Sequence, residues 1–256
     1  LVGSVCALLL AVCLALSFTL LREGHFAACL KKSGYLDTVH AAVLDTCSQY
    51  AAAMGTTADP LANAITPDDV YAGVMHRADS LWHGSTNDET DPFGSLITTY
   101  QDTVAPEPPT YDGYRILQYN CQMEWQSAMA TPFSAALSMV LQYRGIVAIA
   151  MYLSGLLLMG CIALQYLLAD RWRMFCSGLL RMADGCLGAG VILALWLTFG
   201  SGYRSWTAAG DIGYTLFCQW FGAFAPAVAG CAAAVSAVPV LLVLWVCAQF
   251  RRAKSA

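Results

Sequence analysis

The chain contains 256 residues, of which 58% are hydrophobic and only 12% are charged. Because soluble domains carry roughly 25% charged residues, this composition excludes an ordinary water-soluble protein and predicts burial in a membrane. The net charge of −4, with few and scattered basic residues, also argues against nucleic acid as a partner.

Charge is divided unevenly along the chain. Residues 22–144 hold fourteen of the seventeen acidic residues but only six of the thirteen basic ones. Because membrane proteins concentrate Lys and Arg in their short cytoplasmic loops, this division predicts two compartments separated by lipid.

Residues 1–21 form the first predicted element, a run of twenty-one residues without a charge. A cleavable signal peptide has an apolar core of roughly 7–15 residues and a small-residue cleavage site, and no convincing site follows this run. We therefore expect a retained transmembrane helix. The chain begins at Leu1 rather than Met, so we also expect that some N-terminal residues are missing.

Residues 22–144 are predicted to form an extracytoplasmic helical domain. Their apolar residues recur every three or four positions, as in amphipathic helices, and no strand-like alternation occurs. A short helix should continue the first span up to a bend at Ser33 and Gly34. Further helices are expected at 35–54, 67–83 and 92–104, and from 113 through a bend at Pro132 into the second span. Loops are expected at 56–59, 85–89 and 105–112.

One of these helices has clear signals at both ends. Thr66 is a preferred N-cap residue, and Pro67 suits the first helical position. Asp68 and Asp69 complement the positive end of the helix dipole. Gly84 suits the C-terminal end, so the helix is expected between Thr66 and Gly84.

Three more spans are predicted in the second half of the chain. Residues 145–168 lack any charge, and at about 1.5 Å per residue they reach ~36 Å, enough to cross a ~30 Å hydrocarbon layer. Since the backbone must satisfy its own hydrogen bonds in hydrocarbon, this run is expected to be helical. Charge-free runs predict the other two spans at 185–203 and 225–250.

The predicted fold class is therefore an all-α membrane protein with four transmembrane helices and an extracytoplasmic helical bundle between spans 1 and 2. The remaining segments are a connection at 169–184, a short loop at 204–224 and a tail at 251–256. Arginines in the connection and basic residues in the tail place both segments in the cytoplasm by the positive-inside rule. We expect a multi-pass plasma-membrane protein with both termini cytoplasmic.

The predicted topology divides the eleven cysteines. Seven lie in or near spans, where cysteine serves as a small apolar residue. Four lie outside the cytoplasm and allow two disulfides in three pairings. These four are Cys29, Cys47, Cys121 and Cys218.

Height above the membrane selects among the three pairings. If the helices continue straight from the spans, Cys47 and Cys121 lie at ~38 Å and ~35 Å. Cys29 lies at only ~10 Å, which suits Cys218 in the short outer loop. We predict the disulfides Cys47–Cys121 and Cys29–Cys218, with four reduced thiols as the alternative.

No pattern identifies an active site. His76, Asp79 and His83 share one helical face and could hold a metal, but a solvated polar face explains them without a ligand. Motifs of catalytic serines and nucleotide-binding glycines are absent. Arg181 and Asp184 can pair locally where the third span begins. We therefore predict no catalytic residue, no metal and no cofactor, and a protein that is not an enzyme.

A pattern in the first third of the chain supports a family assignment. It consists of Ser33, Gly34, Tyr35, Ile65, Thr66, Val70 and Gly84. This pattern resembles a family of mostly uncharacterised four-span membrane proteins from Gram-positive bacteria. The resemblance implies a bacterial plasma-membrane protein with an outer helical segment after its first span, and it supplies no catalytic residue.

The sequence thus favours a non-enzymatic membrane protein whose outer domain binds a ligand or a protein. Its cytoplasmic segments are too short to form a signalling domain. Signalling would therefore require a membrane-protein partner or a second copy of the chain. Such a partner is expected to dock on small-residue helix faces such as 229–234. An accessory or sensory subunit of a membrane complex fits this description. The alternative is a small membrane enzyme or transporter, with a site near Tyr203, Arg204 or Asp211.

Overall fold

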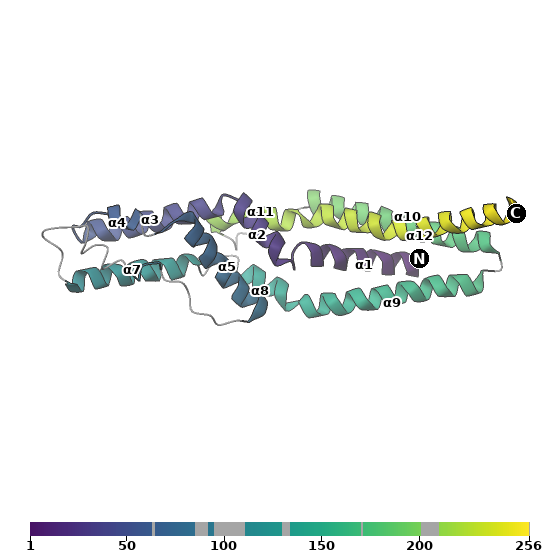
Figure 1. Ribbon diagram of the computed structural model, residues 1–256, viewed down its shortest axis with the longest axis horizontal. Helices are drawn as coiled ribbons and strands as arrows, with labels where there is room; N and C mark the ends of the chain where they lie inside the picture. The colour runs from purple at the N-terminus through teal and green to yellow at the C-terminus, as the bar shows by residue number, and fades with distance from the viewer. Residues whose placement is uncertain are drawn as a thin grey trace. The chain divides into compact units, whose positions relative to one another are not determined.

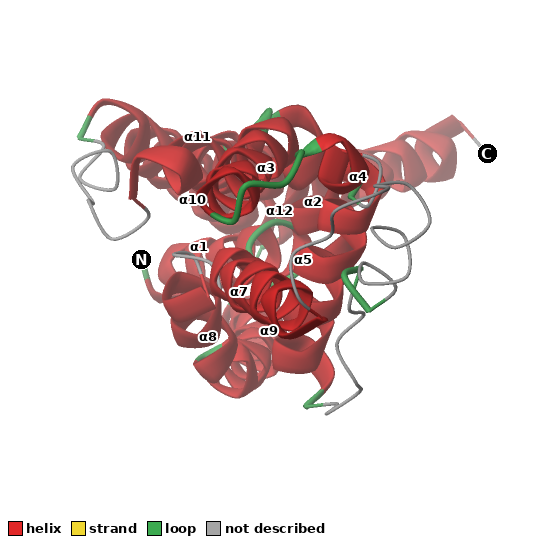
Figure 2. Cartoon of the chain, turned by 90° about the vertical axis from the view of Figure 1, so that its left-hand side faces the viewer, coloured by secondary structure: helices red, strands yellow, loops and turns green. Residues whose placement is uncertain are grey.

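The computed structural model describes residues 1–62, 65–84, 92–94, 111–129, 134–169, 171–200 and 210–255. Within these ranges every regular element is a helix, as predicted (Figures 1 and 2). The chain divides into two compact units. The span unit comprises Leu1–His25, Gln142–Trp206 and Trp220–Ala256, and the inserted unit comprises Phe26–Leu141 and Thr207–Gln219.

The span unit is built from four helices. These are α1 (Val2–Phe18), α9 (Arg144–Leu168), α10 (Trp172–Phe199) and α12 (Phe224–Ser255). Among the described residues, three helical stretches are long and apolar enough to cross a membrane: 136–168, 172–199 and 213–249. A fourth is obtained when α1 and the following helix α2 (Glu23–Lys32) are counted as one interrupted span. This confirms a helical protein with three or four candidate membrane-spanning helices.

Small side chains form the centre of the span unit. α10 and α12 pack together most extensively, and α1 contacts α9, α10 and α12. One buried cluster consists of Ala7, Ala11, Cys186 and Ala232. A Cβ atom at Gly190 would lie only 2.3 Å from the Ala232 Cβ, so glycine is required for this close approach of α10 and α12.

The third span begins earlier than the sequence indicated. α10 begins at Trp172, so most of the predicted connection at 169–184 is helical. Arg181 and Asp184 are exposed, while Met182 and Ala183 between them are buried. The two charges interrupt the apolar run but lie on the outer face of a helix that continues through them.

The inserted unit contains the remaining helices. They are most of α2, α3 (Tyr35–Ala53), α4 (Asp59–Ala62), α5 (Pro67–His83), α7 (Tyr111–Met129), most of α8 (Ser134–Gln142) and most of α11 (Gly210–Gly222). α3 packs against both α5 and α7, and α5 also contacts α7 (Figure 1). The predicted loop at 204–224 therefore contains a helix, α11.

Both predicted ends of α5 are confirmed. The Thr66 hydroxyl accepts a hydrogen bond from the Asp69 N–H at 3.3 Å, and the Asp69 carboxylate accepts one from the Thr66 N–H at 2.8 Å. This is a reciprocal capping box, with Pro67 in the first turn. Gly84 ends the helix with φ 69°, a left-handed conformation that suits glycine.

The predicted bend at Ser33 and Gly34 is also confirmed, because α2 ends at Lys32 and α3 begins at Tyr35. The Ser33 hydroxyl donates to the Leu30 carbonyl at 3.0 Å and accepts from the Tyr35 N–H at 3.2 Å. Several other predictions fall largely outside the described residues. These are the helix at 92–104, of which only the turn at 92–94 is described, the loops at 85–89 and 105–112, and the bend at Pro132.

Candidate functional site

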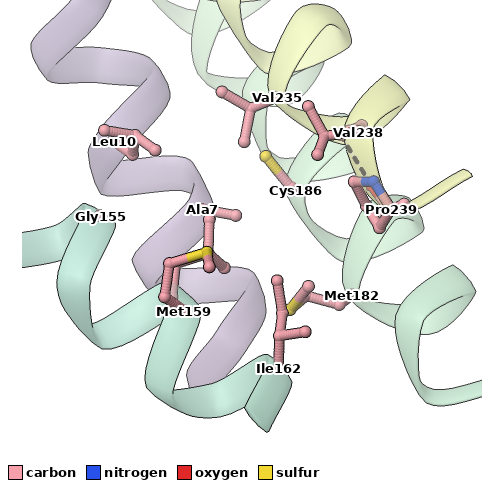
Figure 3. A pocket seen from close by; sticks show the side chains of 13 residues that line it. Ala7, Leu10, Gly155, Met159, Ile162, Met182, Cys186, Val235, Val238 and Pro239 are labelled. Carbon is pink, nitrogen blue, oxygen red and sulfur yellow. Dashed lines mark hydrogen bonds between the residues drawn. The ribbon is translucent and has the colours of Figure 1, made fainter. Parts of the chain in front are cut away.

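An apolar cavity of about 340 Å³ lies inside the span unit. All four helices of the unit contribute to its wall (Figure 3). Leu10 lies on α1, Met159 on α9, Met182 on α10 and Val238 on α12. No charged residue lines the cavity. Its size falls in the roughly 300–1,000 Å³ range of small-molecule sites.

The polar side chains in the wall are hydrogen-bonded within the bundle. The Ser236 hydroxyl donates to the Ala183 carbonyl at 3.1 Å, which joins α12 to α10. The Cys186 thiol donates to the Ala232 carbonyl, with 3.9 Å between sulfur and oxygen. The polar side chains of the wall, Cys186 and Ser236, therefore both link α10 to α12.

A second candidate lies in the inserted unit, where two thiols meet. Cys47 on α3 and Cys121 on α7 are both fully buried, and their side chains are hydrogen-bonded to each other. The hydrogen bond to Cys121, followed by burial and the nearby Glu124 carboxylate, raises the pKa of the Cys47 thiol well above its usual range. Cys47 is therefore protonated at neutral pH, and its reactive thiolate is scarce.

The structure thus brings together one of the two predicted cysteine pairs, as thiols. All eleven cysteines are in the thiol form. Cys29 is buried and Cys218 is half-buried, and no disulfide joins these two residues in the structure. Neither predicted disulfide is therefore formed in the structure.

The histidines that the sequence singled out lie on two helices of the inserted unit. His83 Nδ1 is 2.7 Å from the Asp79 carboxylate one turn earlier on α5, and this pair is well exposed. His40 Nε2 lies 3.0 Å from the carbonyl oxygen of Ile65, so it ties α3 to the segment before α5. His40 is thus a residue of the helical bundle.

A feature missed by sequence reasoning is that α7 is apolar on two faces. Its inner face buries Tyr114, Leu117, Cys121 and Trp125. Its outer stripe consists of Ile116, Tyr119 and Met123, which are 56%, 60% and 49% exposed. Their i, i+3, i+7 spacing predicts a second apolar face on this helix, beside the more strongly apolar core face.

A scan against protein-family models finds no match for this chain, and comparisons with curated proteins and with solved structures find none either. The interpretation of both units therefore follows from their geometry and chemistry.

Proposed function

We propose that this protein is a non-enzymatic integral membrane protein, an accessory or sensory subunit whose inserted unit binds a protein partner outside the cytoplasm. The observation that carries the proposal is the outer stripe of α7. Among the described residues, α3 and α5 pack against α7, whose inner face supplies the buried side chains. The three large apolar side chains on the other face cost free energy in water unless a partner covers them.

The charge distribution supports the proposed orientation. The acidic segment 22–144 supplies most of the inserted unit, and six of the seven basic residues outside this segment lie at 171–181 or 251–254, near the start of α10 and the end of α12. Positive charge is retained on the cytoplasmic side of membrane proteins. We therefore propose four spans, both termini in the cytoplasm and the inserted unit outside, in the plasma membrane of a Gram-positive bacterium as the family resemblance implies.

A disulfide between Cys47 and Cys121 belongs to the same proposal. The two thiols are already in contact, and an extracytoplasmic location would oxidise such a pair. Cys29–Cys218 is the proposed second bridge. Peptide mapping of unreduced protein from intact cells tests both bridges, and recovery of all four residues as thiols would argue against an oxidising compartment.

The binding proposal is tested with variants of the inserted unit. The full-length protein is purified in mild detergent from its native host, with its partners retained. Tyr119→Lys places a charge in the centre of the outer stripe and is expected to remove the co-purifying protein. Gln49→Lys adds the same charge to the neighbouring helix α3, at an exposed position on the side away from its buried residue Cys47, and it should leave the complex intact.

Two results would contradict this function. One is a wild-type chain that always migrates alone in mild detergent. The other is loss of the partner in both variants, which would indicate that any added positive charge on the inserted unit, rather than disruption of the apolar stripe, prevents binding.

A further inference from the structure

We propose that the span unit binds one acyl chain of a bilayer phospholipid in its apolar cavity. This inference is independent of the partner-binding function proposed for the inserted unit. It requires only that the helices of the span unit cross a membrane, as their length and composition indicate.

The cavity has a buried floor and an exposed rim. Ala7, Cys186 and Met182 at the floor are 3%, 0% and 4% exposed, whereas Met159 and Val238 at the rim are 67% and 60% exposed. The rim residues belong to α9 and α12, which face each other across the cavity in Figure 3 and make at most sparse contact. The cavity therefore opens sideways, between two membrane-spanning helices.

A lateral opening between spans faces the hydrocarbon layer, where the surrounding molecules are lipid tails. A void there would remove the dispersion contacts of the side chains that line it, so occupation is favourable. The available volume of about 340 Å³ suits a slender unbranched chain. It excludes another transmembrane helix, whose diameter with side chains is about 10–12 Å.

Water is a poor occupant of this cavity. The Ser236 hydroxyl and the Cys186 thiol already donate to backbone carbonyls. Pro239 has no N–H, so the Val235 carbonyl lacks its donor within α12. The Ser236 oxygen can still accept one hydrogen bond, so the wall offers a water two good acceptors and no free side-chain donor, whereas a buried water makes about three hydrogen bonds.

The same wall chemistry identifies which part of the lipid enters. Without charged residues in the wall, a phosphate or ammonium headgroup would lose its hydration with no compensation. A saturated or unsaturated tail loses no hydration when it enters, because the lipid and the cavity wall are equally apolar. Met159 and Met182 are flexible side chains that can adapt to the shape of the chain.

Gly155 provides a way to fill the cavity without disturbing the bundle. A Cβ atom at Gly155 would meet no atom within 4 Å, and the residue lines the cavity on α9. Gly155→Leu is therefore expected to place its side chain in the cavity. A Cβ atom at Gly160 would likewise meet no atom within 4 Å, but this residue lies outside the cavity wall. Gly160→Leu is therefore a matched control on the same helix.

The test uses full-length protein in phosphatidylcholine vesicles that contain a fraction of phosphatidylcholine with a diazirine in one acyl chain. After irradiation, labelled peptides are mapped by mass spectrometry. We expect labelling at Ile162 and Met182, which line the cavity. In Gly155→Leu, labelling of these residues should fall about tenfold, because the acyl chain loses roughly ten carbon–carbon contacts. Gly160→Leu should label as the wild type does.

Equal labelling of the cavity in Gly155→Leu and wild type would overturn the proposal, as would labelling confined to outward residues such as Ile149 and Leu156. Phospholipid retained after delipidation in detergent provides a second measurement. About one molecule per chain should remain with wild type and Gly160→Leu, and less with Gly155→Leu. Because no protein partner is present, failure here would leave the function proposed for the inserted unit untouched.

Discussion

The span unit and the inserted unit are both helical, but side chains of different size hold them together. The inserted unit buries large aromatic residues, among them Phe26, Tyr35, Trp82 and Trp125. The rings of Phe26 and Trp82 lie 5.4 Å apart, and those of Phe93 and Trp125 meet edge to face at 6.4 Å. Such contacts are what a helical bundle in water needs, because burial of apolar area is its main driving force.

The span unit buries alanine and cysteine at its centre and has a second buried cluster with Leu179, Met182 and Val243, while many of its other large side chains are exposed. Leu156 on α9 and Trp196 on α10 are 71% and 67% exposed. In lipid an outward leucine has no unfavourable free energy of exposure, because lipid tails are as apolar as its side chain. Helices in a membrane therefore associate through the close approach of small residues. This difference is the one expected between helices that pack in lipid and helices that pack in water. The outer stripe of α7 is among the large apolar side chains that the described part of the inserted unit leaves exposed.

The largest effect is expected from removing an aromatic side chain from the inserted unit. Trp125→Ala should destabilise the inserted unit by about 3–5 kcal/mol, since it deletes a buried ring in contact with Phe93. Trp196→Ala in the span unit should change stability by less than about 0.5 kcal/mol, because its ring is mainly exposed. Urea titration in micelles, followed by circular dichroism, measures both. Equal effects would remove the contrast between the two cores.

A smaller effect is expected where the span unit is tightest. Gly190→Ala forces a methyl group to within 2.3 Å of the Ala232 Cβ and should cost about 1–3 kcal/mol by overpacking. Gly188→Ala adds the same methyl group to α10 where no atom lies within 4 Å, and it should be harmless. Thermal unfolding in detergent compares the variants. A harmless Gly190→Ala would mean that α10 and α12 can separate without penalty.

The smallest effect concerns helix ends. α9 and α10 begin without a side-chain cap, whereas α5 begins with the capping box of Thr66 and Asp69. Thr66→Ala should therefore destabilise the inserted unit by about 1 kcal/mol. Thr46→Ala removes an exposed hydroxyl that bonds only within its own helix, to Ala42, and should fall within about 0.5 kcal/mol of wild type. Urea midpoints distinguish the two, and identical midpoints would assign no stabilising role to the capping box.

Features that depend on neighbouring residues in the chain could be predicted from the sequence. Thr66, Pro67 and Gly84 define α5 because capping is a local hydrogen-bonding requirement. The start of α10 could not be read from the sequence for a related reason. Charge ends an apolar run, but a helix carries Arg181 and Asp184 on an exposed face without interruption.

The candidate sites depended on contacts between distant segments. Helical rise alone brought Cys47 and Cys121 to similar heights, but only the packing of α3 against α7 places their thiols in contact. The cavity had no signal in the sequence, because it arises where four helices leave space around Gly155 and Pro239.

By itself, the sequence determined that this chain is helical, that apolar stretches alternate with an acid-rich segment, and where one helix is capped. These properties follow from hydrophobicity and local hydrogen bonding, which need no knowledge of the partner helix. Tertiary structure decided which cysteines lie together, which apolar side chains of α7 are exposed and where the span unit encloses an apolar cavity. Such properties are set by how side-chain volumes fit between helices, and volume can be matched only once the helices are placed side by side.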